Sequence, residues 1–376
     1  MRLLWAELKD FRNHPNTRLP DIPDGLVVAV GGNGEGKTNL LEGLAFLFFL
    51  ASPRVSSTEP LVRRGAEAAY VRGEIETAGG RIMVEVEIPG RGANRVHVNR
   101  SPVRRKRDLR RQVRAAFFGP DDLDVVRGDP SERRRFMDEA VTSLWPLKES
   151  ALTAYDRTLR QRNRLLKDWE GRAGPADLET WDRELVENGC AVMRLRTEAV
   201  ARLAPGAEEE FGVLAGYGLA SEYRPSVWGE NLEEAFRERL AERRQDELVR
   251  RTSLVGPHRD DLELAVRDLG ARAFASHGEA WGAALCLRLG LAEALGEEAG
   301  ERPVVLLDDP FSALDPQRQT RVGERLSARG QVVLSVADEA HVPAHMDAVW
   351  EVSAGAVTVR GGGSGVSTSD PGRGGG

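Results

Sequence analysis

The chain has 376 residues, of which 41% are hydrophobic and 30% charged, and its net charge is −6. This composition is typical of a soluble globular protein, and the length favours two domains or one large domain with an insertion. The longest apolar stretch, Leu40–Ala51, contains Glu42 and is too short to span a bilayer. The N-terminus has no secretory signal pattern, and the two cysteines, Cys190 and Cys286, have no histidines at metal-ligand spacing. We therefore expect a cytoplasmic protein without a membrane partner.

Positive charge is concentrated in one segment of this acidic chain. Asp108 is the single acidic residue among eight basic ones, which are Arg100, Arg104, Arg105, Lys106, Arg107, Arg110, Arg111 and Arg114. A local basic patch can bind a polyanion such as DNA, but a charge run is equally often a solvated face. The run Arg133–Arg135 has the same two interpretations.

The first part of the chain predicts strands around one buried helix. Leu3–Leu8 and Leu26–Val30 have strand patterns, and Asn39–Leu50 is apolar nearly all round, as expected of a buried helix. Val71–Ile88 alternates around a central Gly pair and predicts a hairpin, followed by a short strand at Arg95–Asn99.

The middle of the chain has long, charged, helical periodicity from Glu132 to about Arg251. We expect breaks at Gly171–Pro175, Pro205-Gly206 and Tyr223–Gly229. An α/β pattern resumes at Val255, with buried parallel strands predicted at Pro303–Leu307 and Gln331–Ala337 and a last pair of strands within Val349–Val359. Residues 361–376 are rich in Gly and Ser and predict a flexible tail.

The segment Gly31–Thr38 (GGNGEGKT) matches the phosphate-binding pattern G-x-x-x-x-G-K-[ST] between a predicted strand and a predicted helix. Glycines let the backbone curl so that its N–H groups point at phosphate oxygens, and the helix adds the positive end of its dipole. The alternative is a chance Gly-rich turn. We predict ATP binding by Gly31, Gly32, Asn33, Gly34, Glu35, Gly36, Lys37 and Thr38, with Lys37 on the β/γ-phosphates and the Thr38 hydroxyl on Mg²⁺.

The second motif is Val304–Asp309 (VVLLDD), an apolar strand that ends in two acidic residues. Asp308 is placed to reach the Mg²⁺ held by Thr38, and Asp309 to orient or deprotonate an attacking water. An ordinary strand followed by a polar turn is the alternative interpretation, which the phosphate-binding loop makes less favourable.

Two further segments resemble motifs of the ABC-type ATPases. Ser312–Asp315 resembles the D-loop, which assigns Asp315 to the site, and Ala275–Glu279 resembles a diverged signature motif that opens an apolar helix. In that family the signature helix caps the nucleotide of a second subunit, which implies that Ser276 and Gly278 act across a dimer. Alone, the signature segment could equally be a helix N-cap.

Several blocks resemble the RecF family of bacterial recombinational repair, relatives of SMC proteins without the long coiled coil. These blocks are Leu8–Asn13, the loop region Gly31–Glu42, Phe118–Leu123, Arg133–Asp138 and Gly256–Leu262. The resemblance implies that Arg12 and Asn13 reach the nucleotide phosphates. It also implies an ATP-dependent homodimer on gapped or junction DNA, with RecR and RecO as partners that help load RecA. A site role for His258 and Arg259 is open, with a structural turn as the alternative.

Three departures from the ABC pattern favour a slow, switch-like ATPase. No histidine stands in the segment Val333–Ala337 after the last core strand, Asp309 replaces the usual glutamate, and no Gln lies at a lid position. We expect an α/β ABC-type ATPase head formed by residues 1–118 and 255–360, with a helical arm at 119–254. Lys37, Asp309, Ser276 and Asp315 are its predicted catalytic residues. The rival functions are a DNA-binding scaffold with a structural nucleotide and a transport motor.

Overall fold

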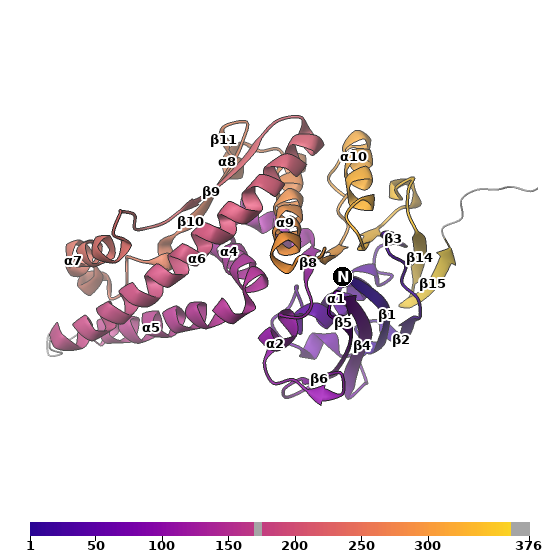
Figure 1. Cartoon of the computed structure of the whole chain (residues 1–376), viewed down its shortest axis with the longest axis horizontal. Helices are drawn as coiled ribbons and strands as arrows, with labels where there is room; N and C mark the ends of the chain where they lie inside the picture. The colour runs from indigo at the N-terminus through magenta and orange to yellow at the C-terminus, as the bar shows by residue number, and fades with distance from the viewer. Residues whose placement is uncertain (169–174, 362–376) are drawn as a thin grey trace, which may run out of the picture.

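The structure is a computed structural model that describes residues 1–168 and 175–361. The predicted break at Gly171–Pro175 and the predicted tail lie outside these residues, apart from one residue each. The described residues form a two-sheet head from which a helical arm projects, on the left of Figure 1. No helix in the described ranges is both long and apolar enough to cross a membrane.

A mixed six-stranded sheet forms the centre of the head. Its strand order is β15-β14-β3-β13-β12-β8, and all strands except β15 run parallel to their neighbours. The bounds are β3 Leu26–Val30, β8 Ala115–Phe118, β12 Val304–Leu307, β13 Val332–Val336, β14 Ala348–Ser353 and β15 Ala356–Gly361. β3, β8, β12 and β13 are buried along their whole length, because helices or a second sheet cover both faces. The predicted strands at Leu26–Val30, Pro303–Leu307 and Gln331–Ala337 are confirmed.

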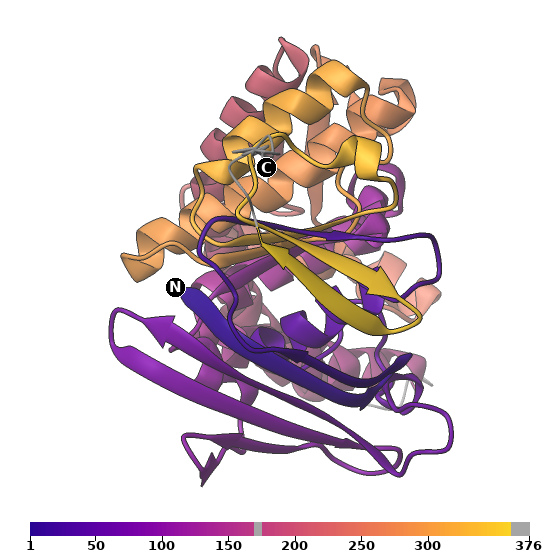
Figure 2. The ribbon, with the colours of Figure 1, turned by 90° about the vertical axis from the view of Figure 1, so that its right-hand side faces the viewer.

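An antiparallel sheet lies across one face, in the order β2-β1-β4-β5-β6-β7. Its strands are β1 Arg2–Phe11, β2 His14–Leu19, β4 Ala68–Thr77, β5 Gly80–Pro89, β6 Arg95–Val98 and β7 Ser101–Pro102. Helix α1 (Lys37–Phe49) lies between the two sheets, and Leu40, Leu44 and Phe48 on it are fully buried in the shared core. Figure 2 shows this sheet below and the yellow β14 and β15 above it.

Helices cover the opposite face of the central sheet and form a second core. They are α3 (Leu123–Arg127), α4 (Pro130–Leu144), α9 (His277–Ala299) and α10 (Pro316–Ser327), joined by part of α6 (Pro175–Ala215). Successive side chains of a strand point to opposite faces of the sheet, so the central strands contribute to both cores. In β3, for example, Val27 lies in the first core and Val28 in the second.

The projecting arm has a third core of its own. It is built by α5 (Glu149–Lys167), α7 (Leu232–Arg250) and the first half of α6, around Met193 and Phe236. The second half of α6 packs instead with α9 in the head. The division of the chain at 119–254 stays a prediction.

Two features of the middle segment differ from the predictions. Pro205-Gly206 is not a break, because α6 runs through it: Pro205 lies on the exposed side, and Gly206 lies where α6 crosses α9 at Gly290. A strand was also missed, since β9 (Leu219–Arg224) pairs with β10 (Asp261–Val266) and β10 with β11 (Leu269–Gly270). Its partner is distant in sequence, so no local pattern identified it.

The remaining helices are short. They are α2 (Lys106–Arg110), α8 (Ala271–Phe274) and the 3₁₀ turns η1 Glu59–Leu61, η2 Pro120–Asp122, η3 Pro146–Lys148, η4 Pro257–Arg259 and η5 Glu339–His341.

The α6–α9 crossing predicts a stability difference between two glycine variants. A Cβ on Gly290 would lie 2.4 Å from the Leu203 carbonyl oxygen and 2.6 Å from the Ala207 nitrogen, both backbone atoms. We expect Gly290→Ala to lower the free energy of unfolding by about 1–3 kcal/mol through overpacking. Gly212→Ala, in the same helix α6 but with open space around the new methyl, should be neutral or stabilising. Thermal melts of both variants test this, and equal melting temperatures would contradict it.

Candidate nucleotide site

The candidate site lies at one edge of the central sheet. Strands β3, β13 and β12 are neighbours and parallel, so their carboxyl ends meet there. The phosphate-binding loop follows β3, and Asp308 and Asp309 follow β12. β13 lies between them and contributes Ser335. The topology therefore brings together two motifs that lie about two-thirds of the chain apart.

The loop curls at Gly36, which has φ 117° and immediately precedes α1. This conformation favours glycine, and a Cβ there would also lie 2.7 Å from the Asn13 side-chain nitrogen. The first N–H groups of α1 have no acceptor within their own helix, and they point out of its N-terminus at the loop. The curl therefore produces the anion-binding geometry that the motif predicts.

Three groups outside the loop hold its backbone. Asn13 Nδ2 donates to the Glu35 carbonyl oxygen at 3.1 Å, and the Gly355 N–H donates to the same oxygen at 2.9 Å. The buried His14 ring contacts the Gly36 carbonyl oxygen through Nε2 at 2.9 Å. Burial lowers the pKa of His14, and the hydrogen bonds to the backbone of Gly36 and Gly355 oppose this shift. His14 and Gly355 had no motif to identify them.

Lys37 is almost fully buried and lies back across its own loop. Its Nζ donates to the carbonyl oxygens of Gly31 at 2.6 Å and Gly32 at 2.9 Å. Burial lowers the pKa of Lys37, and the carboxylates of Asp309 and Asp308 oppose this shift. The ammonium group thus lies at the loop, hydrogen-bonded to two neutral carbonyl oxygens. A bound triphosphate would give it a negatively charged partner there.

Asp308 joins α1 to two strands. Its Oδ1 accepts a hydrogen bond from the Thr38 hydroxyl at 3.0 Å and another from the Ser335 hydroxyl at 2.7 Å. The Asp309 N–H in turn donates to Ser335 Oγ at 2.9 Å, and the Asp309 backbone is left-handed, with φ 50°. Ser335 thus fixes both acidic residues from the strand between them.

Burial raises the pKa of both carboxyl groups at the site. For Asp308 the hydrogen bonds from Ser335 and Thr38 oppose the rise, whereas for Asp309 the neighbouring Asp308 increases it. Two carboxylates held close together in a buried place favour a cation between or beside them.

A hollow of about 260 Å³ lies among these groups. Of the predicted residues it is lined by Asn33, Gly34, Gly36, Lys37, Thr38, Asp308 and Asp309. Asn39, Arg54, Ser335 and Ala337 also line it and were not predicted as site residues. The positive charge of Arg54 also opposes the rise in the pKa of Asp308, by less than the two hydrogen bonds do. It lies in an irregular segment after α1, where nothing in the sequence indicates its direction.

Arg12 does not line this hollow. Its guanidinium forms two hydrogen bonds of 2.9 Å with the buried carboxylate of Glu42 on α1, and Arg54 pairs with the same carboxylate at 3.3 Å. Arg12 is therefore held beside the first turns of α1. Its contact with nucleotide phosphates stays a prediction.

The signature segment begins helix α9 with Ser276 as its N-cap. The Ser276 hydroxyl accepts a bond from the Glu279 N–H at 3.3 Å, and Glu279 accepts one from the Ser276 N–H at 2.7 Å. Tyr217, Ser276 and Arg267 together hold the pKa of Glu279 at about 2. Glu279 is thus fully engaged within its own chain.

The signature helix and the D-loop are in contact. A Cβ on Gly278 would lie 3.0 Å from the Ala313 carbonyl oxygen, and Trp281 Nε1 donates to the Pro310 carbonyl oxygen at 2.9 Å. Asp315 is the N-cap of α10 and accepts the Arg318 N–H at 3.0 Å. Ser276, Gly278 and Asp315 do not line the hollow at the phosphate-binding loop of their own chain. Their role at a nucleotide stays a prediction.

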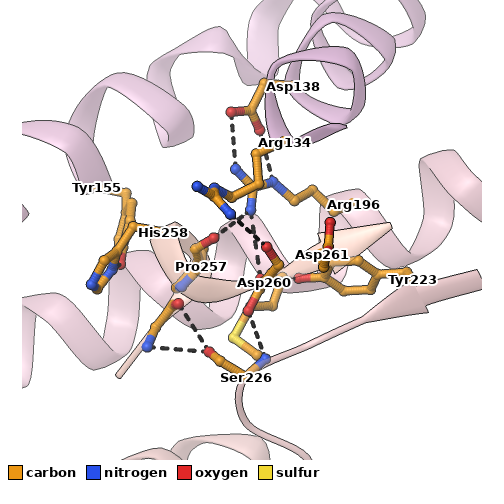
Figure 3. A network of polar contacts seen from close by, with 12 residues as sticks. Arg134, Asp138, Tyr155, Arg196, Tyr223, Ser226, Pro257, His258, Asp260 and Asp261 are labelled. Atoms are coloured by element: carbon orange, nitrogen blue, oxygen red, sulfur yellow. Dashed lines mark hydrogen bonds and ion pairs between the residues drawn. The ribbon is translucent and has the colours of Figure 1, made fainter. Parts of the chain in front are cut away.

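A buried polar network fixes the Gly256–Leu262 block where the arm meets the head (Figure 3). The Tyr155 hydroxyl lies 2.6 Å from His258 Nδ1, and His258 Nε2 lies 3.0 Å from the Ser253 carbonyl oxygen. Arg196 forms a bidentate pair with Asp138 at 2.8 and 2.9 Å. Burial lowers the pKa of His258 to about 4. These contacts support the structural interpretation of His258.

The two basic runs differ in how their charges are used. Arg133 is buried and forms a bidentate pair with Asp261 at 2.6 and 2.8 Å, and Arg134 donates to the Asp260 carbonyl oxygen. Arg133 is therefore a structural residue, unavailable to DNA. Arg104 and Arg105 are exposed and have no polar side-chain partner among the described residues.

The donor set fits a magnesium nucleotide. The Thr38 hydroxyl and the Asp308 carboxylate are the hard oxygen ligands that Mg²⁺ prefers, and phosphate oxygens and water would complete its coordination. The described residues contain no group of three or more His, Cys, Asp or Glu side chains placed to hold a metal alone. The phosphate-binding loop, the acidic strand end, the signature helix and the D-loop on this sheet topology define an ABC-type ATPase head.

Residues 3–358 match the family model of the RecF/RecN/SMC N terminal domain. The chain is 43% identical to the DNA replication and repair protein RecF of Frankia alni, over 95% of this chain and 99% of that protein. It is 40% identical to the protein of the same name from Streptomyces avermitilis, over 91% and 95%. The chain belongs to the RecF family.

Solved structures agree with this assignment. The recombination mediator protein RecF with ATP, of the RecFOR pathway, superimposes with a TM-score of 0.85 at 28% identity, over 95% of this chain and 97% of that one. An Smc head bound to the C-winged helix domain of ScpA superimposes with a TM-score of 0.56 at 16% identity, over 96% and 97%, which shows the shared fold.

The buried Asp308 carboxyl predicts opposite effects on stability and ligand binding. A carboxyl whose pKa is raised by folding destabilises the fold when ionised, above that pKa, and this cost disappears as the pH falls below it. We expect Asp308→Asn to raise the melting temperature of the nucleotide-free chain at pH 7, with a smaller difference at lower pH. It should weaken Mg²⁺-dependent ATP binding at least tenfold, since a charged ligand is lost.

Melting curves between pH 4 and 8 and nucleotide titrations with and without Mg²⁺ measure both effects. Asp124→Asn, an exposed aspartate on α3, is the matched control and should change neither. A destabilised Asp308→Asn chain at pH 7 would contradict the prediction.

Proposed function

We propose that the chain binds ATP with Mg²⁺ and acts as an ATP-dependent DNA-binding protein of DNA replication and recombinational repair. The observation that carries this proposal is the convergence of Lys37, Thr38 and Asp308 on one hollow at the end of β3. The ATP-bound relative, which matches nearly the whole chain, supports the same nucleotide. Gly31–Gly36 would cradle the phosphates, Lys37 would neutralise them, and Thr38 and Asp308 would hold the metal.

ATP then closes two copies of the chain into a two-fold dimer. Ser276 and Gly278 belong to a helix N-terminus suited to an anion, yet they do not line the hollow of their own chain. A second copy related by a two-fold axis brings each Ser276 to the nucleotide of its partner. The D-loop contact with Gly278 ties this surface to Asp309 of the same chain, four residues before Ala313.

Hydrolysis in this dimer is slow and serves to reopen it. Asp309 is one methylene shorter than the usual glutamate, so its carboxylate reaches less far toward an attacking water and is a poorly placed general base. The dimer holds DNA through its phosphate backbone, without base recognition, at gaps or single-strand–double-strand junctions. RecR and RecO are the proposed partners, and loading of RecA is the proposed outcome.

Two variants separate nucleotide binding from dimerisation. We expect Ser276→Arg to bind ATP with wild-type affinity but to remain monomeric with ATP, because the arginine blocks the partner surface. Lys37→Met should lose both ATP binding and dimerisation, because the triphosphate charge is unmatched. Sedimentation velocity with ATP, ADP and no nucleotide measures the oligomeric state. Loss of ATP binding in Ser276→Arg would place Ser276 in its own chain's site, and a Lys37→Met chain that dimerises normally would exclude the sandwich.

The exposed Arg104 and Arg105 before α2 and the half-buried Arg107 within it are the proposed DNA contacts. Changing Arg104, Arg105 and Arg107 together to Ala should weaken binding to all DNA sequences alike. It should also reduce the slope of log affinity against log salt by up to about three. Arg237, Arg243 and Arg250 of α7, changed together, are the control set for net charge. An unchanged slope in the first set would locate the DNA site elsewhere, and DNA affinity indifferent to ATP with no phosphate production would favour the scaffold.

A further inference from the structure

A second hollow, of about 450 Å³, adjoins the nucleotide hollow. The two share Thr38, Arg54 and Asp308 in their walls. The second hollow begins at the metal side of the site and runs between the two halves of the head, from the segment after α1 to α4 and α9. Its volume exceeds that of one water molecule, ~30 Å³, by more than tenfold. It is therefore large enough for a tetrahedral oxyanion with its hydration.

The inner hollow adjoins a third hollow at the root of the arm. A third, open hollow of about 670 Å³ lies between α4 and α5, and it shares Arg110, Arg135 and Glu139 with the inner one. Their shared walls place the three hollows in series, as a candidate passage from Asp308 to the arm root. An arginine stands at each junction, Arg54 at the first and Arg110 with Arg135 at the second.

Two of the acidic side chains of the inner hollow share one arginine. Arg288 of α9 bonds to Asp122 at 2.6 Å and to Glu139 at 2.7 and 3.0 Å. Asp308 accepts bonds from Thr38 and Ser335 and is the proposed metal ligand. The lining as a whole has four carboxylates, of Asp121, Asp122, Glu139 and Asp308, and four arginines, Arg54, Arg110, Arg135 and Arg288.

Arg110, in contrast, has hydrogen-bonding capacity to spare. Its Nη2 donates to the Phe49 carbonyl oxygen at 3.1 Å, while its Nε is buried without a hydrogen-bond partner among the described residues. Burial lowers the pKa of Arg110, and Glu149 and Glu139 only oppose this shift from a distance. Arg110 is half-buried and lines both hollows, and the planar guanidinium of an arginine in such a place can bind an oxyanion.

We propose that this passage binds inorganic phosphate and conducts it from the nucleotide site to the arm root, with Arg110 as its anion-binding side chain. The inference rests on the proposed function. Hydrolysis transfers the γ-phosphoryl group to water and yields ADP, inorganic phosphate and a proton. A second copy of the chain covers the front of the site in the proposed dimer, so phosphate needs another way out.

The test uses the full chain with Arg110→Met, Arg110→Lys and the neighbouring exposed Arg111→Met as control. Titration calorimetry measures binding of inorganic phosphate to the nucleotide-free chain and to the chain with ADP and Mg²⁺. Rapid-quench cleavage of ATP and a fluorescent phosphate sensor measure formation and release separately. We expect Arg110→Met to bind phosphate about tenfold more weakly and to release it about tenfold more slowly than it forms. Arg110→Lys should restore part of both, and Arg111→Met should equal the wild type.

Each outcome decides the proposal. Wild-type phosphate binding and release in Arg110→Met, or no phosphate binding by the wild type, overturns it and leaves the proposed function intact. If the wild type cleaves no ATP, the hydrolysis part of the proposed function fails, and the binding titration alone decides whether Arg110 holds an anion. Weaker DNA binding by Arg110→Met with unchanged phosphate binding assigns the side chain to a DNA phosphate and overturns the passage.

Discussion

The hydrogen bonds that converge on Asp308 are the constraint on which the site depends. They join the first turn of α1, through Thr38, to the end of β12, and Ser335 fixes the same carboxylate from β13. Because α1 is packed between both sheets, a shift of Thr38 would disturb the whole first core. The arrangement of loop, acidic strand end and intervening serine is therefore set by the core as much as by the ligand. Because these side chains are already held in place, little conformational entropy is lost at the site when the nucleotide binds.

The sequence predicted the parts of this site that are continuous in the chain. A Gly-rich loop after a buried strand and two acidic residues after another are local patterns, and fully apolar strands are recognisable because both faces are covered. Ser335, Arg54 and His14 were missed because each acts through a neighbour that is close only after folding. Ser335 is one polar residue inside the apolar strand β13, and its hydroxyl meets Asp308 and the Asp309 N–H only in the folded chain. Pro205 was misread for the opposite reason: a strong local signal was overridden by the packing of α6 on α9.

Charge runs were the least informative pattern. The chain has 53 basic and 59 acidic residues, so most arginines can find a carboxylate, and only the fold decides which do. Arg133 and Arg196 form ion pairs where the arm joins the head, whereas Arg104 and Arg105 have no ion-pair partner within the part of the chain that the structure describes. An acidic protein can thus keep a locally basic surface, because its carboxylates are used for internal pairing.

Helix α6 has a mechanical consequence. It is a single helix of 41 residues whose second half is packed on the signature helix α9 and whose first half belongs to the arm. The stretch from its start to the crossing at Gly206 spans about 45 Å at 1.5 Å per residue. A tilt of about 5° at the crossing therefore moves the far end of the arm by about 4 Å. A tilt of a few degrees between α6 and the signature helix α9 thus becomes a displacement as large as an atom's diameter at the tip, so the position of the arm reports the state of the head.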